Sequence, residues 1–365
     1  MTSTYALTPF PPQMDLQTVP ILRALAPARA ALGELKGGVT SLPNPSILLN
    51  TLFLQEALAS SEIENIVTTQ DEVFQVDLFP DNYPGSAEAK EVARYREAMN
   101  LGYAAWRENG FISENMLVDM YRLLKQRDDG YRQTAGVVLR NQQTRETVYD
   151  PPQDRREIET YMRDLANFIN EQPPYQIDPL IRMALIHHQF ESIHPFSDGN
   201  GRIGRVLNVL YLTHVGLLDS PILYLSRAIN HTKSDYYRLL QAVREQGAWE
   251  AWIIYLLDAV TETAKSTLHL VSNIKNLMAK HKQYMRDELP KIYSQDLLNN
   301  LFRNPYTRIE YVAYDLEVGR QTARKYLRQL TEKGLVEELK SGRNNYYINR
   351  ELVDLFVGIS AEDNQ

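Results

Sequence analysis

Residues 194–205 read His-Pro-Phe-Ser-Asp-Gly-Asn-Gly-Arg-Ile-Gly-Arg, a run that combines an imidazole, a carboxylate, three glycines and two arginines. Glycines at 199 and 201 let the backbone turn tightly and direct its N–H groups toward an anion. Arg202 and Arg205 begin a segment whose apolar residues recur at helical spacing. The loop is therefore expected to lead into a helix N-terminus, which favours bound phosphate. The run predicts a phosphate site with a proton acceptor beside it.

Two side chains of this run add chemistry to the phosphate site. Asp198 would repel a bare anion, but it fits if Mg²⁺ bridges its carboxylate to the phosphates, since Mg²⁺ prefers one or two carboxylates plus phosphate oxygens. His194 carries an imidazole with an ordinary pKa of about 6.5, so it accepts a proton near pH 7. A base positioned in this way contributes roughly 10²–10⁴-fold to a reaction rate.

Two further histidines precede the run, in a helix expected from Asp178 to about Ser192. His187 and His188 are interpreted as helix-packing or surface residues rather than as a metal pair. The chain has no cysteine and no HExxH spacing, so the sequence gives little support to a zinc site.

The same run matches the HxFx(D/E)GNGRxx(R) signature at every defined position, and through it the chain resembles the Fic family. The resemblance implies an enzyme that moves AMP from ATP onto a hydroxyl of a target protein, with release of pyrophosphate. In that reaction His194 is the base for the target hydroxyl and Asp198 holds Mg²⁺. The implied partner is a target protein with a Tyr, Ser or Thr hydroxyl, the chain itself included.

The resemblance also implies which residues bind ATP. Backbone N–H groups, arginine side chains and a metal suit the charge that spreads over phosphate oxygens when the α-phosphorus is attacked. The glycines and asparagine of the run would cradle the phosphates, and its two arginines would hold the outer ones. The full ATP-binding set is Glu64, Gly199, Asn200, Gly201, Arg202, Ile203, Gly204, Arg205 and Tyr237.

A change in sequence texture between residues 136 and 152 predicts a short β-hairpin. Taken alone, the hairpin is interpreted as a surface element without a functional role. The resemblance implies instead a flap that clamps a segment of the target by main-chain pairing, with Val138 and Leu139 as its contacts. Tyr236 and Tyr237 have packing as their ordinary interpretation. The family places a tyrosine pair beside the nucleotide base, and we expect Tyr237 to contact adenine.

A second pattern lies at the end of a helix predicted from about Pro45. Residues Ser60, Glu64 and Asn65 fit [S/T]xxxE[G/N], which taken alone describes a polar helix end with a solvated glutamate. Beside the first motif it resembles the inhibitory helix of one class of the family. Glu64 would pair with Arg205, the arginine intended for the γ-phosphate. The same carboxylate would alternatively orient water and make the protein a hydrolase that removes AMP.

The chain is predicted to be mainly α, with a Fic helical core, a small hairpin flap and a C-terminal winged helix. The predicted domains are an N-terminal helical region at 1–110, which includes the inhibitory helix at about 45–66, and a Fic core at 111–280. The core contains the flap and the active-site loop. A winged-helix domain follows at 290–355. Pro27 is expected to kink or divide a helix at 19–37.

The C-terminal residues read as helix, helix, helix and then a hairpin, which resembles a winged helix. The third helix carries Arg320, Arg324, Lys325 and Arg328 opposite its apolar side. From 302 to 350 there are ten Lys and Arg against six Asp and Glu, a difference of +4. This mild excess suits contact with DNA phosphates, and it equally suits the solvated face of a dimerisation or docking module.

Composition limits the remaining choices. The formal net charge of −7 disfavours general coating of nucleic acid, although an average conceals a basic module. The polar start and the lack of a long apolar run predict a cytoplasmic protein with no membrane span, and family habit suggests a homodimer. The alternatives to an adenylyltransferase are therefore the AMP-removing hydrolase and a regulator whose core senses nucleotide while its C-terminal module binds DNA.

Overall fold

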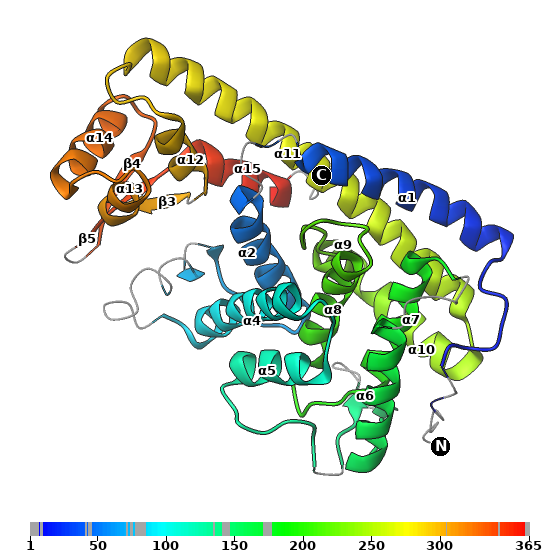
Figure 1. Cartoon of the computed structure of the whole chain (residues 1–365). Coiled ribbons are helices and arrows are strands. Elements are labelled where there is room, and N and C mark those ends of the chain that lie inside the picture. Colours follow the sequence, from blue (N-terminus) through cyan, green and yellow to red (C-terminus); the bar gives the residue numbers. More distant parts are fainter. Residues whose placement is uncertain are drawn as a thin grey trace. The chain divides into compact units, whose positions relative to one another are not determined.

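The computed structural model describes residues 7, 10–40, 42, 46–70, 72–73, 76, 85–133, 136–140, 147–170, 177–303, 305–341 and 344–361. Within them the chain is mainly helical, with two small antiparallel sheets, as the sequence predicts (Figure 1). The helices of the first part are α1 (Val19–Val39), α2 (Ser46–Ile63), α4 (Ala87–Asn109), α5 (Glu114–Lys125), α6 (Arg155–Asn170), α7 (Pro179–Ile193), α8 (Asn200–His214), α9 (Ser226–His231), α10 (Lys233–Gln246) and α11 (Trp249–Glu288).

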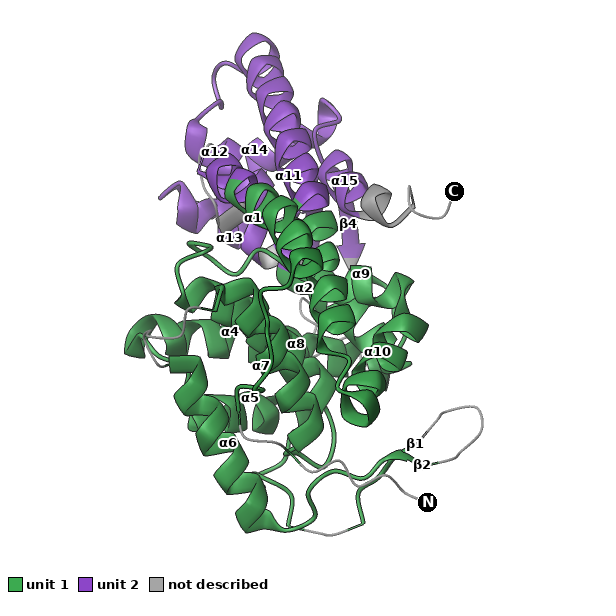
Figure 2. Ribbon diagram, turned by 90° about the vertical axis from the view of Figure 1, so that its right-hand side faces the viewer, with its two compact units in different colours: residues 1–33, 53–264 green, residues 34–52, 265–365 purple. Residues whose placement is uncertain are grey.

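Two compact units make up the chain (Figure 2). Unit 1 comprises residues 1–33 and 53–264, and unit 2 comprises residues 34–52 and 265–365. The sequence at 194–205, the hairpin and the residues around Glu64 all belong to unit 1. The predicted helix, helix, helix and hairpin near the C-terminus belong to unit 2.

Local signals in the sequence explain where several helices begin. The hydroxyls of Ser86 and Ser113 cap α4 and α5, accepting hydrogen bonds from the N–H groups three residues on, at 3.1 Å in both cases. Pro27 neither interrupts nor divides α1, which runs unbroken through it. Ile21, Ala28 and Leu32 share a buried face on both sides of the proline. Their burial offsets the hydrogen bond that proline cannot donate.

The core of unit 1 surrounds α7 and α8, which pack against each other. Every residue of α7 from Leu180 to Ile193 is buried, and α8 is buried along nearly its whole length. Trp252 of α11 is fully buried and donates from its indole N–H to the carbonyl of Ala184 at 2.9 Å. The loop between α7 and α8 is thus held at both ends by buried helices.

The predicted hairpin is present as β1 (Leu139–Arg140) and β2 (Thr147–Tyr149), and its polar tip lies outside the described residues. Leu139 pairs with Tyr149, and the register shifts by a bulge before Arg140. Tyr149 anchors the hairpin, because its hydroxyl donates to the carbonyl of Ser192 at 2.8 Å and its ring lies 3.9 Å from the guanidinium of Arg244.

Unit 2 carries the C-terminal elements in the predicted order, with two additions. Its elements after α11 are α12 (Gln295–Arg303), β3 (Tyr306–Arg308), α13 (Ile309–Asp315), α14 (Arg320–Glu332), β4 (Glu337–Ser341), β5 (Asn344–Ile348) and α15 (Arg350–Ala361). The two additions are β3, which is short, and α15; neither belongs to the predicted order. The sheet order is β3-β5-β4, all antiparallel, so β3 adds a third strand to the β4–β5 hairpin and also contacts α12.

Candidate active site

The loop between α7 and α8 is held rigidly by its own residues. His194 ends α7 in the left-handed conformation, with φ of 50°, which costs a non-glycine residue about 1–2 kcal/mol. The surrounding bonds support it, because Arg132 donates from Nε to the His194 carbonyl at 2.9 Å. Asn200 accepts from the Phe196 N–H and donates to the Phe196 carbonyl, each at 2.8 Å. Both polar atoms of the Asn200 side chain are therefore used to shape the loop. At this position, only the backbone N–H remains to contact a phosphate.

The turn into α8 needs glycine at two positions. Gly199 precedes α8 with φ of 75°, a conformation that favours glycine. A Cβ on Gly204, one turn into the helix, would lie 2.7 Å from Oε1 of Glu191 and 3.0 Å from Phe190. This close approach lets α8 pack directly on α7. The first N–H groups of α8 have no intrahelical partner and face the loop end, as an anion site requires.

His194 lies in an electropositive environment. Burial, together with the positive charges of Arg244 and Arg132, lowers its pKa to about 3. The imidazole is therefore neutral at physiological pH and has a free lone pair for a proton. Anionic phosphates in the same place would reverse part of this shift, because they favour the charged form of a histidine.

Arg205 is held by the end of α2, with only 2% of its side chain exposed. Its Nε donates to Oγ of Ser60 at 2.8 Å, and its Nη2 donates to the Ser60 carbonyl and to Oε1 of Glu64, both at 2.9 Å. Burial lowers the pKa of Arg205, but Glu64 and the nearby tyrosines together outweigh this effect, and the pKa is raised. The structure thus brings Ser60, Glu64 and Arg205 together, in the contact that the resemblance to the inhibitory helix implies. Asn65, next in the pattern, accepts from Nζ of Lys233 at 3.3 Å.

Two more carboxyl groups are buried around Arg205. Glu56 of α2 binds the hydroxyl and the N–H of Ser226, and Glu191 of α7 lies against Gly204. Burial raises the pKa of each to about 7, partly opposed by the charge of Arg205. Arg205 thus has compensating groups besides Glu64, and nothing in the local sequence around Glu56 or Glu191 marks them.

Asp198 and Arg202 belong to a four-residue ionic cluster, defined here as Glu91, Lys125, Asp198 and Arg202. Lys125 Nζ lies 2.6 Å from Oδ2 of Asp198 and 2.7 Å from Oε1 of Glu91. Arg202 Nη1 lies 2.8 Å from the same Glu91 oxygen, and its side chain is 1% exposed. To reach a phosphate, the Arg202 side chain would have to leave Glu91.

Asp198 has the donor chemistry for one Mg²⁺ contact. Its side chain is 62% exposed. Burial raises the pKa of the Asp198 carboxyl, but Lys125 and the Gly199 N–H lower it by more, so the carboxylate is ionised. Among the described residues no group of three or more His, Asp or Glu side chains lies close enough to hold a metal alone. The donor set therefore fits Mg²⁺ that is held mainly by phosphate oxygens and water, provided that Lys125 leaves Oδ2.

The paired tyrosines and histidines separate into packing and accessible residues. His187 is fully buried and lies 2.9 Å from the hydroxyl of Tyr236, which is also buried. His188 is buried against Trp249 with Nε2 3.2 Å from the Leu240 carbonyl. The packing interpretation of both histidines is confirmed. Tyr237 is 42% exposed, and burial and the charge of Glu64 raise its pKa.

Val138 and Leu139 of the flap are half-buried. Gln153 braces this segment by accepting from the Gly136 N–H at 2.7 Å and donating to the Val137 carbonyl at 2.9 Å. Gln241 of α10 donates to the Val148 carbonyl at 3.0 Å on the second strand. The hairpin is therefore docked on α7 and α10, beside the end of the loop that carries His194.

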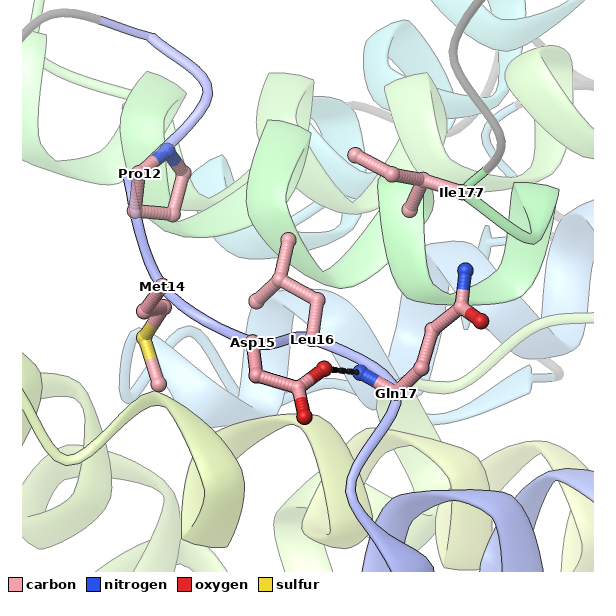
Figure 3. Close-up of a pocket in the computed structure, with 6 residues that line it drawn as sticks. All are labelled: Pro12, Met14, Asp15, Leu16, Gln17 and Ile177. Carbon is pink, nitrogen blue, oxygen red and sulfur yellow. Dashed lines mark hydrogen bonds between the residues drawn. The ribbon is translucent and has the colours of Figure 1, made fainter.

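A pocket of about 260 Å³ lies elsewhere in unit 1. It is lined by Pro12, Met14, Asp15, Leu16, Gln17 and Ile177 (Figure 3). Within it, Oδ1 of Asp15 accepts from the Gln17 N–H at 2.8 Å, which closes a local turn in the N-terminal segment. No residue of the 194–205 run lines this pocket, and it lacks basic side chains for a phosphate.

A left-handed histidine, a glycine-rich turn and a buried helix that carries two arginines give this helical protein a candidate anion-binding site. Three family models match the chain: the Fic/DOC family N-terminal model at residues 22–104, the Fic/DOC family model at 111–212, and the C-terminal domain of protein adenylyltransferase SoFic-like proteins at 277–352. The chain belongs to the Fic/DOC family.

Curated relatives match parts of the chain. A probable protein adenylyltransferase of Aquifex aeolicus is 28% identical over 174 residues, which is 47% of this chain and 51% of that protein. The protein adenylyltransferase fic-1 of Caenorhabditis elegans is 32% identical over 79 residues, or 22% of this chain and 14% of that protein. The chain thus spans about half or less of the length of these relatives.

Solved structures share the fold. A Fic family protein from Desulfovibrio desulfuricans G20 aligns with a TM-score of 0.56 and 22% identity, over 91% of this chain and 96% of that one. Fic-1 from C. elegans aligns with a TM-score of 0.54 and 18% identity, over 71% of this chain and 75% of that one. No described helix is both long and apolar enough to cross a membrane.

Proposed function

We propose that this chain is a protein adenylyltransferase that moves AMP from ATP onto the hydroxyl of a target protein, and that Glu64 restrains it. The observation that carries the proposal is the loop between α7 and α8, in which residues 195–199 join the neutral His194 at the end of α7 to the first turn of α8. The printed names of the Aquifex and Caenorhabditis relatives support the same activity.

In the proposed reaction, the target hydroxyl oxygen bonds to the α-phosphorus, the bond to the bridging oxygen breaks, and pyrophosphate leaves. The hydroxyl proton passes to the imidazole of His194. Backbone N–H groups at the start of α8 and the guanidinium of Arg205 stabilise the phosphate oxygens. Asp198 would hold Mg²⁺, which when bound neutralises charge on the departing pyrophosphate.

The remaining roles follow from position. Leu139 in β1 and Val138 just before it would pair through their main chains with an extended segment of the target, which brings the target hydroxyl toward His194. Tyr237 contacts the adenine ring. Glu64 takes the guanidinium of Arg205 that the γ-phosphate needs, which leaves ATP poorly aligned for attack.

The test is incubation of the chain and a cell lysate with α-labelled ATP and Mg²⁺. Label retained on protein supports the transferase. Release of AMP from a modified target instead supports the hydrolase, in which Glu64 orients water. If label is not retained and AMP is not released, nucleotide sensing remains as the function of the site.

The pH dependence of transfer follows from the pKa of His194. A base acts only when it is neutral, and the neutral fraction falls as pH drops through the pKa. Because that pKa is about 3, we expect kcat/KM of a Glu64→Gly variant to stay level from pH 8 to pH 5.5 at saturating Mg²⁺. Initial rates across this range are the measurement. An acid limb with an apparent pKa near 6.5 would contradict the electropositive setting of the histidine.

A second function, duplex DNA binding by unit 2, is favoured by a specific observation. The order α12, β3, α13, α14, β4 and β5, with sheet order β3-β5-β4, supports a winged helix, and we propose α14 as its recognition helix. On α14, Arg320 pairs with Glu310 and Arg328 pairs with Glu332. The side chains of Arg324 and Lys325 are exposed on the same helix and available to phosphates.

We expect duplex affinity to fall with salt, and the Arg324→Ala, Lys325→Ala double variant to reduce the salt slope by about 2. Fluorescence anisotropy of a labelled duplex at several salt concentrations measures this slope. A matched control replaces Lys282 and Lys291, which lie in unit 2 outside α14, with alanine. Equal slopes in the two double variants, or affinity independent of salt, would remove α14 as a phosphate-binding surface.

A further inference from the structure

Lys125 has the strongest contact to Asp198, yet the proposed reaction gives it no role. It is the last residue of α5, where a basic side chain suits the helix C-terminus. Its ammonium lies between two carboxylates, 2.6 Å from Asp198 and 2.7 Å from Glu91, with 17% of the side chain exposed. Leu124 and Lys125 also lie within 3.6 Å of a Cβ built on Gly199, so the end of α5 packs against the turn into α8.

The cluster balances its own charges. Glu91 and Asp198 supply two negative charges, and Lys125 and Arg202 supply two positive ones, with Arg202 fully buried on Glu91. Asp198 is the one outward-facing member, since its side chain is 62% exposed while those of Glu91 and Lys125 are at most 20% exposed. A divalent cation that approached from solvent would therefore meet the Asp198 carboxylate first, and would find Lys125 already there.

We propose that Lys125 is an internal counter-ion for Asp198 that a divalent cation must displace when it binds. This inference rests on the proposed function for its cation. An ammonium and a metal ion on one carboxylate oxygen repel each other, so both do not occupy Oδ2 together. Once displaced from Asp198, Lys125 keeps Glu91 as its partner, which leaves the end of α5 and the position of Arg202 supported.

Competition between Lys125 and the cation predicts the opposite change in cation affinity from a purely structural role. If Lys125 only stabilised the loop, its removal would loosen Asp198 and weaken cation binding. If Lys125 competes with the cation, its removal strengthens binding. We expect Lys125→Met to tighten Mn²⁺ binding about three- to tenfold. This range corresponds to removing one partly exposed ion pair with which the cation competes, together with the repulsion between the ammonium and the cation.

The experiment titrates Mn²⁺, without nucleotide, into the full chain and follows water proton relaxation. Asp198→Asn defines the binding that other carboxylates contribute, and binding specific to the site is the difference from that variant. Lys125→Arg keeps the positive charge and is expected to stay within about twofold of wild type. Thermal unfolding of each variant shows that the fold is retained.

Two results would overturn the proposal. The first is Mn²⁺ affinity in Lys125→Met that equals or falls below that of wild type. The second is equal binding by wild type and Asp198→Asn, because Asp198 would then hold no cation. AMP transfer is assayed separately with the same substitutions in the Glu64→Gly background, where the restraint is removed. Tighter Mn²⁺ binding without any transfer in that background would contradict the proposed function and leave the role of Lys125 standing.

Discussion

Replacing Glu64 with glycine is expected to raise AMP transfer about 10- to 100-fold. The variant removes the charged acceptor that holds Nη2 of Arg205 at 2.9 Å, and a hydrogen bond to a charged group contributes about 1.5–3 kcal/mol. Each 1.36 kcal/mol corresponds to a factor of ten. The freed guanidinium then binds the γ-phosphate. Transfer of label from α-labelled ATP at equal enzyme concentration measures the effect.

The variant is expected to fold, because Arg205 keeps Ser60 as a partner and Glu56 and Glu191 as nearby acids. Glu62→Gly is the matched control. It removes an exposed carboxylate and introduces a glycine in the same helical turn, without contact to Arg205. Activity that is equal or lower in the Glu64 variant would remove the restraint from the account. A rise that Glu62→Gly reproduces would trace it to loosening of the end of α2.

Replacing His194 with alanine is expected to lower AMP transfer by about 10²–10⁴-fold, since the base that takes the hydroxyl proton is lost. The effect is best measured in the Glu64→Gly background, where the starting rate is highest. ATP binding should change little, because the phosphates contact α8 and Arg205 rather than the imidazole. Labelled transfer and equilibrium binding of a fluorescent ATP analogue together separate the two quantities.

The control must allow for the left-handed backbone at position 194, which an alanine tolerates less well than an asparagine does. His194→Asn therefore tests the same loss of the base with less backbone strain, and both variants are expected to be inactive. His231→Ala, at an exposed histidine of unit 1, is expected to transfer AMP like the parent. Substantial transfer by His194→Asn would assign the proton to another group.

Several features of the site were predictable because they depend on residues close together in the chain. The glycines at 199 and 201, the periodic apolar residues after them and Asp178 at the helix start predicted a helix, a tight turn and a second helix, and the structure has all three. The hairpin at 136–152 was likewise predictable, because β-branched residues, which favour strands, lie on both sides of a polar segment. The contact of Glu64 with Arg205, 141 residues apart, was accessible only through resemblance to a family.

Other features were hidden from the sequence because side chains distant in the chain create them. Arg132 and Arg244, which lower the pKa of His194, come from a loop and from α10, and neither belongs to a pattern. The same holds for Glu91 and Lys125, which draw Arg202 and Asp198 into the ionic cluster.

By itself, the sequence determined the helical class, the loop and the identity of the groups that the loop offers to an anion. Those depend on backbone preferences and on the period of apolar residues, which are local. Only the tertiary structure decided the charge state and the partners of these groups. A residue's electrostatic environment is set by which helices pack against it, and hydrophobic periodicity specifies a buried face without specifying the polar side chain that meets it.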